Sequence, residues 1–175
     1  LVHIDRNFHM NNAAYVRESN FARRDFWRRY PKVLAFMKEQ GLGFVVAAQV
    51  IRHRRELRLW QAYDIESRVI CWDDRDRSFY MEFRFVKSGF VHAIHHVKYT
   101  IIGKKTKATK AIEPSALLEA AGISVGPPTL REDIAAWKEQ ISICSRLAPR
   151  GAQGVRIAKQ FLKIEKVIYE EENVS

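Results

Sequence analysis

An alternation of apolar and polar residues between residues 78 and 87 constrains the fold of this chain more than any other feature of its sequence. Successive side chains of a β-strand face opposite sides, so the apolar members of this segment share one face. These members are Phe79, Met81, Phe83 and Phe85. Similar patterns predict strands over residues 44–55, 63–73 and 90–102. Four consecutive strands, each with one apolar face, form an antiparallel sheet that must bury that face.

A long amphipathic helix is predicted before these strands, over residues 13–30. Asn11 or Asn12 suits its N-cap, and Pro31 ends it. A short helix over residues 32–40 follows. The long helix is the only long amphipathic partner that precedes the sheet. We therefore expect an α+β fold in which the antiparallel sheet wraps around a long central helix, the hotdog arrangement, whose usual first strand would lie at or before Leu1.

The pattern changes after Gly103. A basic linker follows, and helices are expected over residues 114–121, 130–146 and 155–172. These changes predict a hotdog domain at residues 1–113, with its first strand truncated, and a C-terminal helical extension at residues 114–175.

The chain is basic, with a formal net charge of +10 over 175 residues. Residues 1–60 hold 12 Lys and Arg against 5 Asp and Glu, which is +7 of that excess. Such a bias suits a phosphate-bearing ligand, an anionic membrane face or nucleic acid, and equally a solvated basic surface. Two cysteines without a CxxC motif suit a reducing compartment or simply two buried thiols, and we expect an intracellular location. A membrane-associating segment upstream of Leu1 is a further expectation.

The segment Asp5-Arg6-Asn7-Phe8-His9-Met10-Asn11-Asn12 is dense in groups that polarise a carbonyl or position water. It stands just before a predicted helix start, where free amides favour a developing oxyanion. Thioester hydrolysis needs such an electrophilic site together with a carboxylate or an imidazole that activates water. The same residue types also serve turns and helix caps, so the residues alone leave both interpretations open.

The segment with Tyr15 resembles the Asp-x-Asn-x-His-x-Asn-Asn-x-x-Tyr signature of hotdog acyl thioesterases, including plant acyl-carrier-protein thioesterases. The chain is more similar still to thioesterase superfamily member six and its relatives. That likeness rests on His9 to Asn12, on His53-Arg54-Arg55 and on Trp72-Asp73-Asp74-Arg75. It covers roughly residues 1–103, and more weakly continues through Trp137.

The resemblance implies a role for each matching residue. Asp5, Asn7 and His9 correspond to the signature's carboxylate, amide and imidazole, and Glu56 follows two arginines as the acidic residue of the plant enzymes does. Glu56 is therefore the candidate general base, although a surface glutamate is the plainer interpretation. The candidate substrate-binding residues are Asn11, Asn12, Tyr15, Arg52, Arg54 and Arg55.

These residues predict hydrolysis of a fatty acyl-CoA or a similar acyl thioester, without a cofactor. A non-catalytic acyl-CoA or lipid-binding member of the same fold is the alternative, and a protein that binds anionic surfaces is a third. We expect a homodimer and allow for peripheral membrane contact. No metal site is expected from His92, His95 and His96, because no carboxylate or cysteine accompanies them in the sequence. Nucleic acid is not expected as a partner, because no nucleic-acid motif accompanies the basic residues.

Overall fold

The computed structural model describes residues 8–103, 112–124, 126 and 130–147. The contacts divide the chain into two compact units, Leu1–Ile134 and Ala135–Ser175. The described part of the first unit holds almost all of the secondary structure. Its elements are α1 (Asn12–Arg28), α2 (Pro31–Glu39), β1 (Leu42–His53), β2 (Asp64–Asp73), β3 (Ser78–Lys87), β4 (Phe90–Gly103) and α3 (Pro114–Ala120). Helix α4 (Glu132–Leu147) begins in the first unit and continues into the second.

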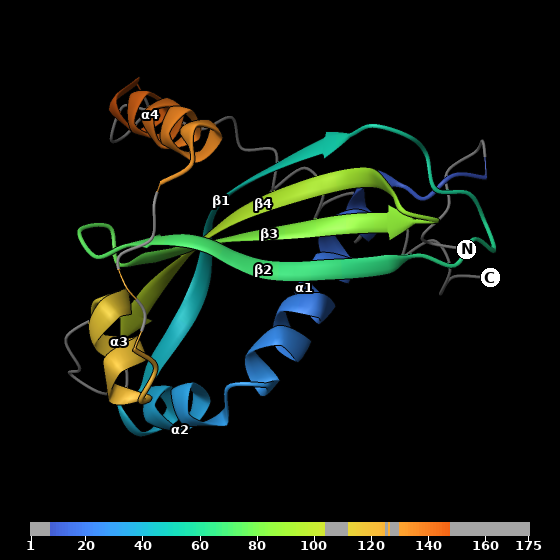
Figure 1. Ribbon diagram of the computed structural model, residues 1–175. Helices are drawn as coiled ribbons and strands as arrows, with labels where there is room; N and C mark the ends of the chain where they lie inside the picture. The colour runs from blue at the N-terminus through green and yellow to red at the C-terminus, as the bar shows by residue number, and fades with distance from the viewer. Residues whose placement is uncertain (1–7, 104–111, 125, 127–129, 148–175) are drawn as a thin grey trace, which may run out of the picture. The chain divides into compact units, whose positions relative to one another are not determined.

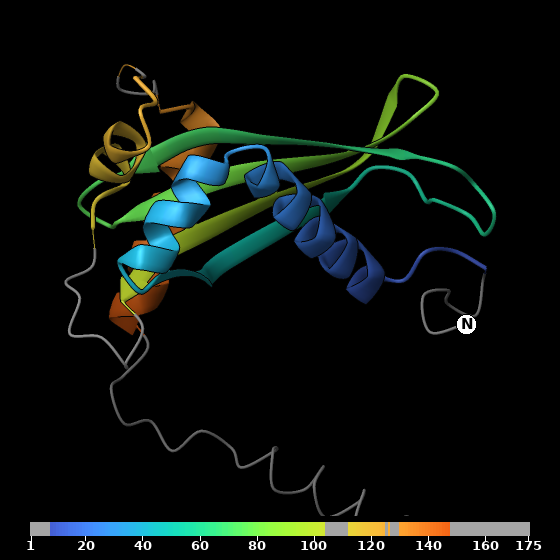
Figure 2. The same cartoon turned by 90° about the horizontal axis from the view of Figure 1, so that it is seen from below.

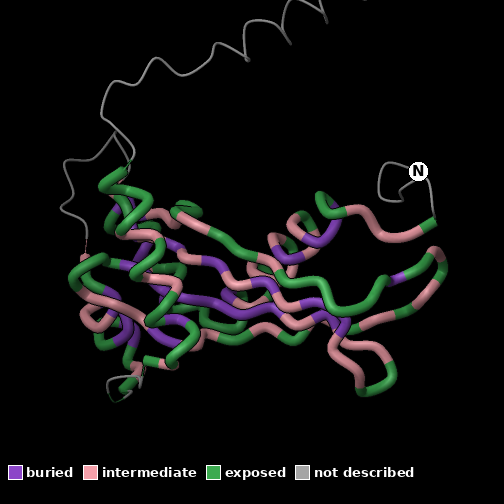
Figure 3. Tube along the Cα trace, turned by 90° about the horizontal axis from the view of Figure 1, so that it is seen from above, coloured by how far each residue is buried: buried purple, intermediate pink, exposed green. Residues whose placement is uncertain are grey.

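The four strands form one antiparallel sheet in the order β1-β4-β3-β2 (Figure 1). Strands β3 and β4 occupy its centre, so the residues of their apolar faces are the most deeply buried. Phe79, Met81, Phe83 and Phe85 are all inaccessible to solvent, as the alternation predicts. In Figure 3 the buried stretches follow these central strands.

Helix α1 lies across the inner face of the sheet, with α2 beside it (Figure 2). The Asn11 side chain caps α1 by accepting a hydrogen bond from the Ala14 amide at 2.8 Å. The ring of Tyr15 packs edge-on against Phe85 near the start of the helix, and Trp27 stacks on Phe44 near its end. These contacts confirm the predicted α+β hotdog arrangement, in which the sheet buries its apolar face against the long helix.

The predicted element bounds agree with the structure to within two residues. The strand over residues 78–87 has the predicted bounds, and α1 ends at Arg28 rather than at Tyr30. Tyr30 instead stands at the N-cap position of α2, whose first residue is Pro31, and its side chain makes no capping hydrogen bond. The helix expected over residues 155–172 lies outside the described residues, as does most of the linker after Gly103.

The outer face of β3 is also buried, which the alternation did not predict. Glu82 is only 1% exposed. Its carboxylate binds Arg68 at 2.6 Å, Arg84 at 2.7 Å, and His96 and Arg131 at 2.9 Å each. Burial alone would raise the pKa of Glu82, but hydrogen bonds from His96, Arg131 and Arg68 hold it far below its usual value. We call these five residues the Glu82 cluster.

The helices of the described part are all too short or too polar to cross a membrane. Peripheral membrane contact and an intracellular location stay predictions.

Candidate functional site

The segment before α1 is fastened to the loop that follows β1. The Met10 amide donates to the Leu57 carbonyl at 2.8 Å, and the Leu59 amide donates to the Phe8 carbonyl at 3.0 Å. His9 and Arg58 thereby face each other as an isolated antiparallel bridge. This pairing brings the His9 Nε2 atom to 3.8 Å from the Glu56 Oε1 atom, although the two residues are far apart in the sequence.

A pocket of about 350 Å³ opens where this segment, the start of α1 and the end of β1 meet. We call it the motif pocket. Its lining residues are His9, Met10, Asn12, Tyr15, His53, Arg54, Arg55 and Glu56. Most of the residues predicted from the sequence to form a site therefore line one pocket.

Tyr15 forms the buried side of the motif pocket, and the ring of His53, a more exposed residue, packs against it. Tyr15 is 2% exposed, and its ring lies 4.8 Å from the His53 ring in an edge-on arrangement. Burial raises the pKa of Tyr15, opposed by a backbone hydrogen bond with Leu57. Burial also lowers the pKa of His53. Both rings therefore favour their neutral forms near pH 7, and can donate or accept a hydrogen bond without adding charge.

Glu56 lies at the solvent-facing rim of the pocket. Its Oε1 atom accepts hydrogen bonds from Arg58 Nη2 at 2.8 Å and Nε at 3.2 Å. The hydrogen bond from Arg58, followed by the charge of His9, holds the pKa of Glu56 below its ordinary value. The carboxylate is thus ionised at neutral pH, as a general base must be.

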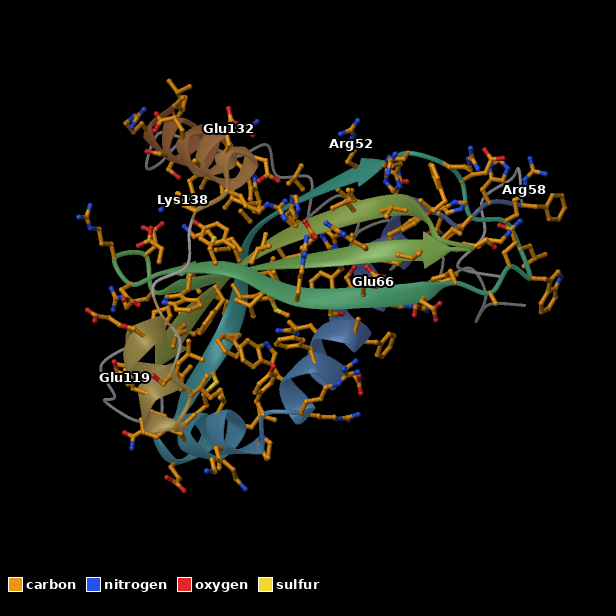
Figure 4. The ribbon with its side chains drawn as sticks, viewed as in Figure 1. Arg52, Arg58, Glu66, Glu119, Glu132 and Lys138 are labelled. Carbon is orange, nitrogen blue, oxygen red and sulfur yellow. The ribbon has the colours of Figure 1, made fainter. Side chains whose placement is uncertain are left out.

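The structure distributes the predicted residues unequally. His9, Asn12, Tyr15, Arg54, Arg55 and Glu56 line the motif pocket. Asn11 caps α1 instead. Arg52 lies on β1 and is not among the lining residues, and in Figure 4 its side chain points away from the sheet. Asp5 and Asn7 lie outside the described residues, so their roles stay predictions.

Two further pockets adjoin the same helix and loop. A basic pocket of about 400 Å³ shares Arg55 and Glu56 with the motif pocket, and its other lining residues are Arg58, Gln61, Lys87, Ser88, Phe90 and His92. A mostly apolar pocket of about 310 Å³ lies at the far end of α1. Its lining residues are Phe26, Trp27, Tyr30, Arg68, Val69, Trp72, Phe79, Leu118 and Ile123.

Each histidine of β4 has a separate partner. His92 Nδ1 lies 3.0 Å from the Glu56 carbonyl oxygen, and His95 Nδ1 lies 2.9 Å from the Ser19 hydroxyl. His96 belongs to the Glu82 cluster. Within the described ranges, no group of three or more His, Cys, Asp or Glu residues could hold a metal ion.

Sequence reasoning gave no role to three residues of this region, His53, Arg58 and His92. The contact of Arg58 with Glu56 could have been predicted from their spacing. Arg58 follows Glu56 by two positions, and residues two apart lie on the same side of an extended chain. His53 stands immediately before the two arginines that the resemblance singled out. The contact of His92 with the Glu56 carbonyl joins residues 36 positions apart, and nothing in the local pattern indicates it.

The sequence profile of one family, described as the thioesterase-like superfamily, matches residues 2–137. The chain belongs to the thioesterase-like superfamily. Among curated relatives of this superfamily member, Protein THEM6 of Xenopus laevis is 43% identical over 102 residues, which cover 57% of this chain and 48% of that protein. The chain spans about half to two thirds of the length of the first curated relatives it matches.

Solved structures agree with this assignment. The probable thioesterase YbaW of Escherichia coli is 25% identical, with a TM-score of 0.57 over 68% of this chain and 88% of that one. The hypothetical protein SAV2348 of Staphylococcus aureus, solved in complex with CoA, is 17% identical, with a TM-score of 0.58 over 74% of this chain and 82% of that one. The second likeness shows the fold alone.

Proposed function

We propose that this superfamily member hydrolyses an acyl thioester, with a fatty acyl-CoA as the expected substrate class. The observation that carries the proposal is the placement of His9 and Glu56 3.8 Å apart on one pocket at the start of α1. An imidazole, an ionised carboxylate and a helix start are the groups that water attack on a thioester requires. The family and the relatives named thioesterase support the reaction class.

In the proposed reaction a water molecule lies between Glu56 and the thioester carbonyl. Glu56 accepts a proton as the water oxygen attacks the carbonyl carbon. The negative charge that develops on the carbonyl oxygen is stabilised by the first amides of α1, with Asn12 and Ala13 the expected donors. The C–S bond then breaks, and the leaving thiolate takes a proton from His9, whose side chain lines the pocket. The products are a free acid and a thiol.

The acyl chain would extend along α1 from the motif pocket toward the apolar pocket. Residues 12 and 27 of one helix are separated by about 22 Å, at 1.5 Å per residue. The aromatic residues Phe26, Trp27 and Tyr30 line the apolar pocket and suit a hydrocarbon or aromatic tail. The length of acyl chain that the protein accepts would then be set by how far this path along α1 is open.

A non-catalytic acyl-thioester binder is the second candidate, and one observation favours it. Glu56 is held by Arg58 in the described structure, and a carboxylate that is hydrogen-bonded to a guanidinium is a weaker base. If Arg58 stays in place with ligand bound, the pocket would bind a thioester without hydrolysing it.

We also propose a homodimer. Strand β1 is one edge of the described sheet, and it leaves Val45, Val46 and Val50 exposed. An edge strand with exposed valines is a surface that proteins ordinarily cover. Light scattering at micromolar concentration should give twice the chain mass, and a stable monomer would contradict the dimer.

A panel of acyl-CoA substrates of increasing chain length tests the main proposal. Continuous detection of the released thiol should show many turnovers per protein molecule for at least one chain length. Thermal stabilisation by acyl-CoA without thiol release would support the binding module instead. If acyl-CoA causes neither thiol release nor thermal stabilisation, both candidate functions are contradicted.

A further inference from the structure

The basic pocket beside the motif pocket is suited to an anion. Three of its lining residues, Arg55, Arg58 and Lys87, are cations, and Glu56 is the only carboxylate among them. That carboxylate is already bound by Arg58. The pocket therefore presents net positive charge next to the place where a thioester carbonyl would lie.

The wall of the basic pocket is held in place by contacts with β4. The Arg54 and Arg55 amides donate to the His92 carbonyl at 2.8 and 3.1 Å. The Arg55 guanidinium lies over the Phe90 ring, with its central carbon 4.3 Å from the ring centroid. His92 in turn contacts the Glu56 carbonyl. These contacts hold the Arg55 guanidinium in place before any ligand binds, and such preorganisation lowers the free-energy cost of binding an anion.

Arg58 links the basic pocket to the motif pocket through its ion pair with Glu56. Its guanidinium lines the basic pocket, while its partner Glu56 lines both pockets. The side chains of Arg58 and Glu56 are 64% and 44% exposed, so their ion pair lies at the surface. Surface pairs of this kind contribute little and exchange readily. A phosphate offers an arginine a stronger, doubly hydrogen-bonded partner.

We propose that the basic pocket binds a phosphate group of the thiol carrier, and that this phosphate draws Arg58 away from Glu56 and so frees the general base. The inference deepens the proposed function and rests on it. The carrier's phosphate would act as the signal that a complete substrate is present. A thioester that lacks a phosphate would meet a base still held by Arg58.

The exchange has a consequence for acid–base behaviour. The groups that face Glu56 are His9 from the segment before α1, Tyr15 from α1, and Arg55 and Arg58 from the loop after β1. His92 of β4 contacts only its carbonyl. The hydrogen bond from Arg58 is the largest cause of the lowered pKa of Glu56. Moving Arg58 to a phosphate therefore raises that pKa and makes Glu56 a stronger base.

Three thioesters of one acyl chain test the proposal: acyl-pantetheine without phosphate, acyl-4′-phosphopantetheine with one, and acyl-CoA with the nucleotide as well. With the parent protein, kcat/KM should rise about tenfold or more when phosphate is present. In Arg58→Gln this advantage should disappear, and the acid limb of the pH profile for acyl-pantetheine should move to higher pH. Arg58→Lys should restore part of the advantage, since it keeps the charge but not the planar fork.

The series also separates two sources of phosphate. Equal stimulation by phosphopantetheine and CoA would support the proposal with the 4′-phosphate as ligand, a group that carrier-protein thioesters share. Stimulation by CoA alone would support it with the nucleotide phosphates as ligand. An unchanged phosphate advantage in Arg58→Gln, or none in the parent protein, would overturn it.

Binding of free CoA gives a readout that needs no turnover. Arg58→Gln and Lys87→Gln should each weaken CoA binding about tenfold in calorimetry. Arg75→Gln is the matched control, because it removes the same charge from the exposed turn at the opposite end of β3. Binding equal to that of the control would overturn the phosphate site. If CoA binding depends on Arg58 but no thioester is hydrolysed, the proposed function fails while the phosphate site stands.

Discussion

Two glutamates of this domain, Glu56 and Glu82, both contact an arginine and a histidine, yet they differ in burial and in the number of their partners. Glu82 is 1% exposed and is bound by three arginines and a histidine at the outer face of the sheet. Glu56 is 44% exposed, binds Arg58, and lies 3.8 Å from His9 on a pocket wall. A carboxylate whose hydrogen-bonding capacity is satisfied by protein cannot also receive a proton from water. The comparison therefore indicates that Glu82 stabilises the fold and that Glu56 is available for chemistry.

The largest effect is expected from substituting Glu82, and it is on the stability of the fold. Glu82→Ala removes the shared partner of three arginines and a histidine and leaves the arginines close together. We expect a loss of about 3 kcal/mol in the free energy of unfolding, at the low end for a buried pair because the arginine heads keep partial contact with water. Denaturant unfolding measures it. A loss no larger than that of the exposed control Glu66→Ala would show that the Glu82 cluster contributes little.

The converse change is Glu56→Gln, which keeps the size of the side chain and removes its charge. If Glu56 is the base, kcat/KM for acyl-CoA should fall about a hundredfold. The melting temperature should stay that of the parent, since the side chain is exposed. Glu66→Gln is the matched control, since Glu66 is an exposed glutamate on β2 (Figure 4). Full activity in Glu56→Gln would remove this residue from the mechanism and favour Asp5 as the base.

The histidines extend the comparison to pH. His95 is 2% exposed, and burial lowers its pKa to about 4. The unfolded chain, with an ordinary histidine pKa near 6.5, therefore takes up this proton first as the pH falls. The stability that comes from keeping His95 neutral is complete above about pH 6.5 and is lost as the pH falls toward 4, by roughly 3 kcal/mol.

His95→Gln should flatten this dependence, because glutamine does not titrate. Unfolding free energies at several pH values between 4 and 7 measure the effect. Parallel curves for the variant and the parent would show that another group causes the loss in acid.

The smallest expected effect is at Asn11, the N-cap of α1 beside the motif pocket. Asn11→Ala removes the bond to the Ala14 amide and should cost about 1 kcal/mol of stability. If the helix start also positions the oxyanion site, activity should fall as well, by severalfold. A loss of stability with unchanged kcat would indicate that Asn11 acts only as a cap.

The fold could be read from the sequence because its determinants are local. The alternation in β3, the Pro31 break and the Asn11 cap each act over a few residues, and together they define the elements and their order. The burial of Glu82 could not be read in this way. It depends on Arg68, Arg131 and His96, which reach the carboxylate from other elements, and no short pattern shows that they converge.

The candidate site could be predicted from the sequence only in part. The resemblance pointed to His9 and Glu56, which the structure brings together, and to Arg52, which it does not bring to the motif pocket. Arg52 is on the other side of the strand from His53, so the alternation of β1 separates two neighbours in sequence. Arg58 was missed because a resemblance transfers roles only to matching positions, whereas its importance comes from the partner it binds.

The central claim is that His9 and Glu56 form one reactive site, and the most direct test is the activity of His9→Ala toward acyl-CoA. The backbone pairing of the neighbours of His9 with the loop after β1 stays in the variant, so it should fold and melt nearly as the parent does. Its kcat/KM should be about a hundredfold lower. Activity equal to that of the parent, or a loss that a lowered melting temperature explains fully, would contradict the account.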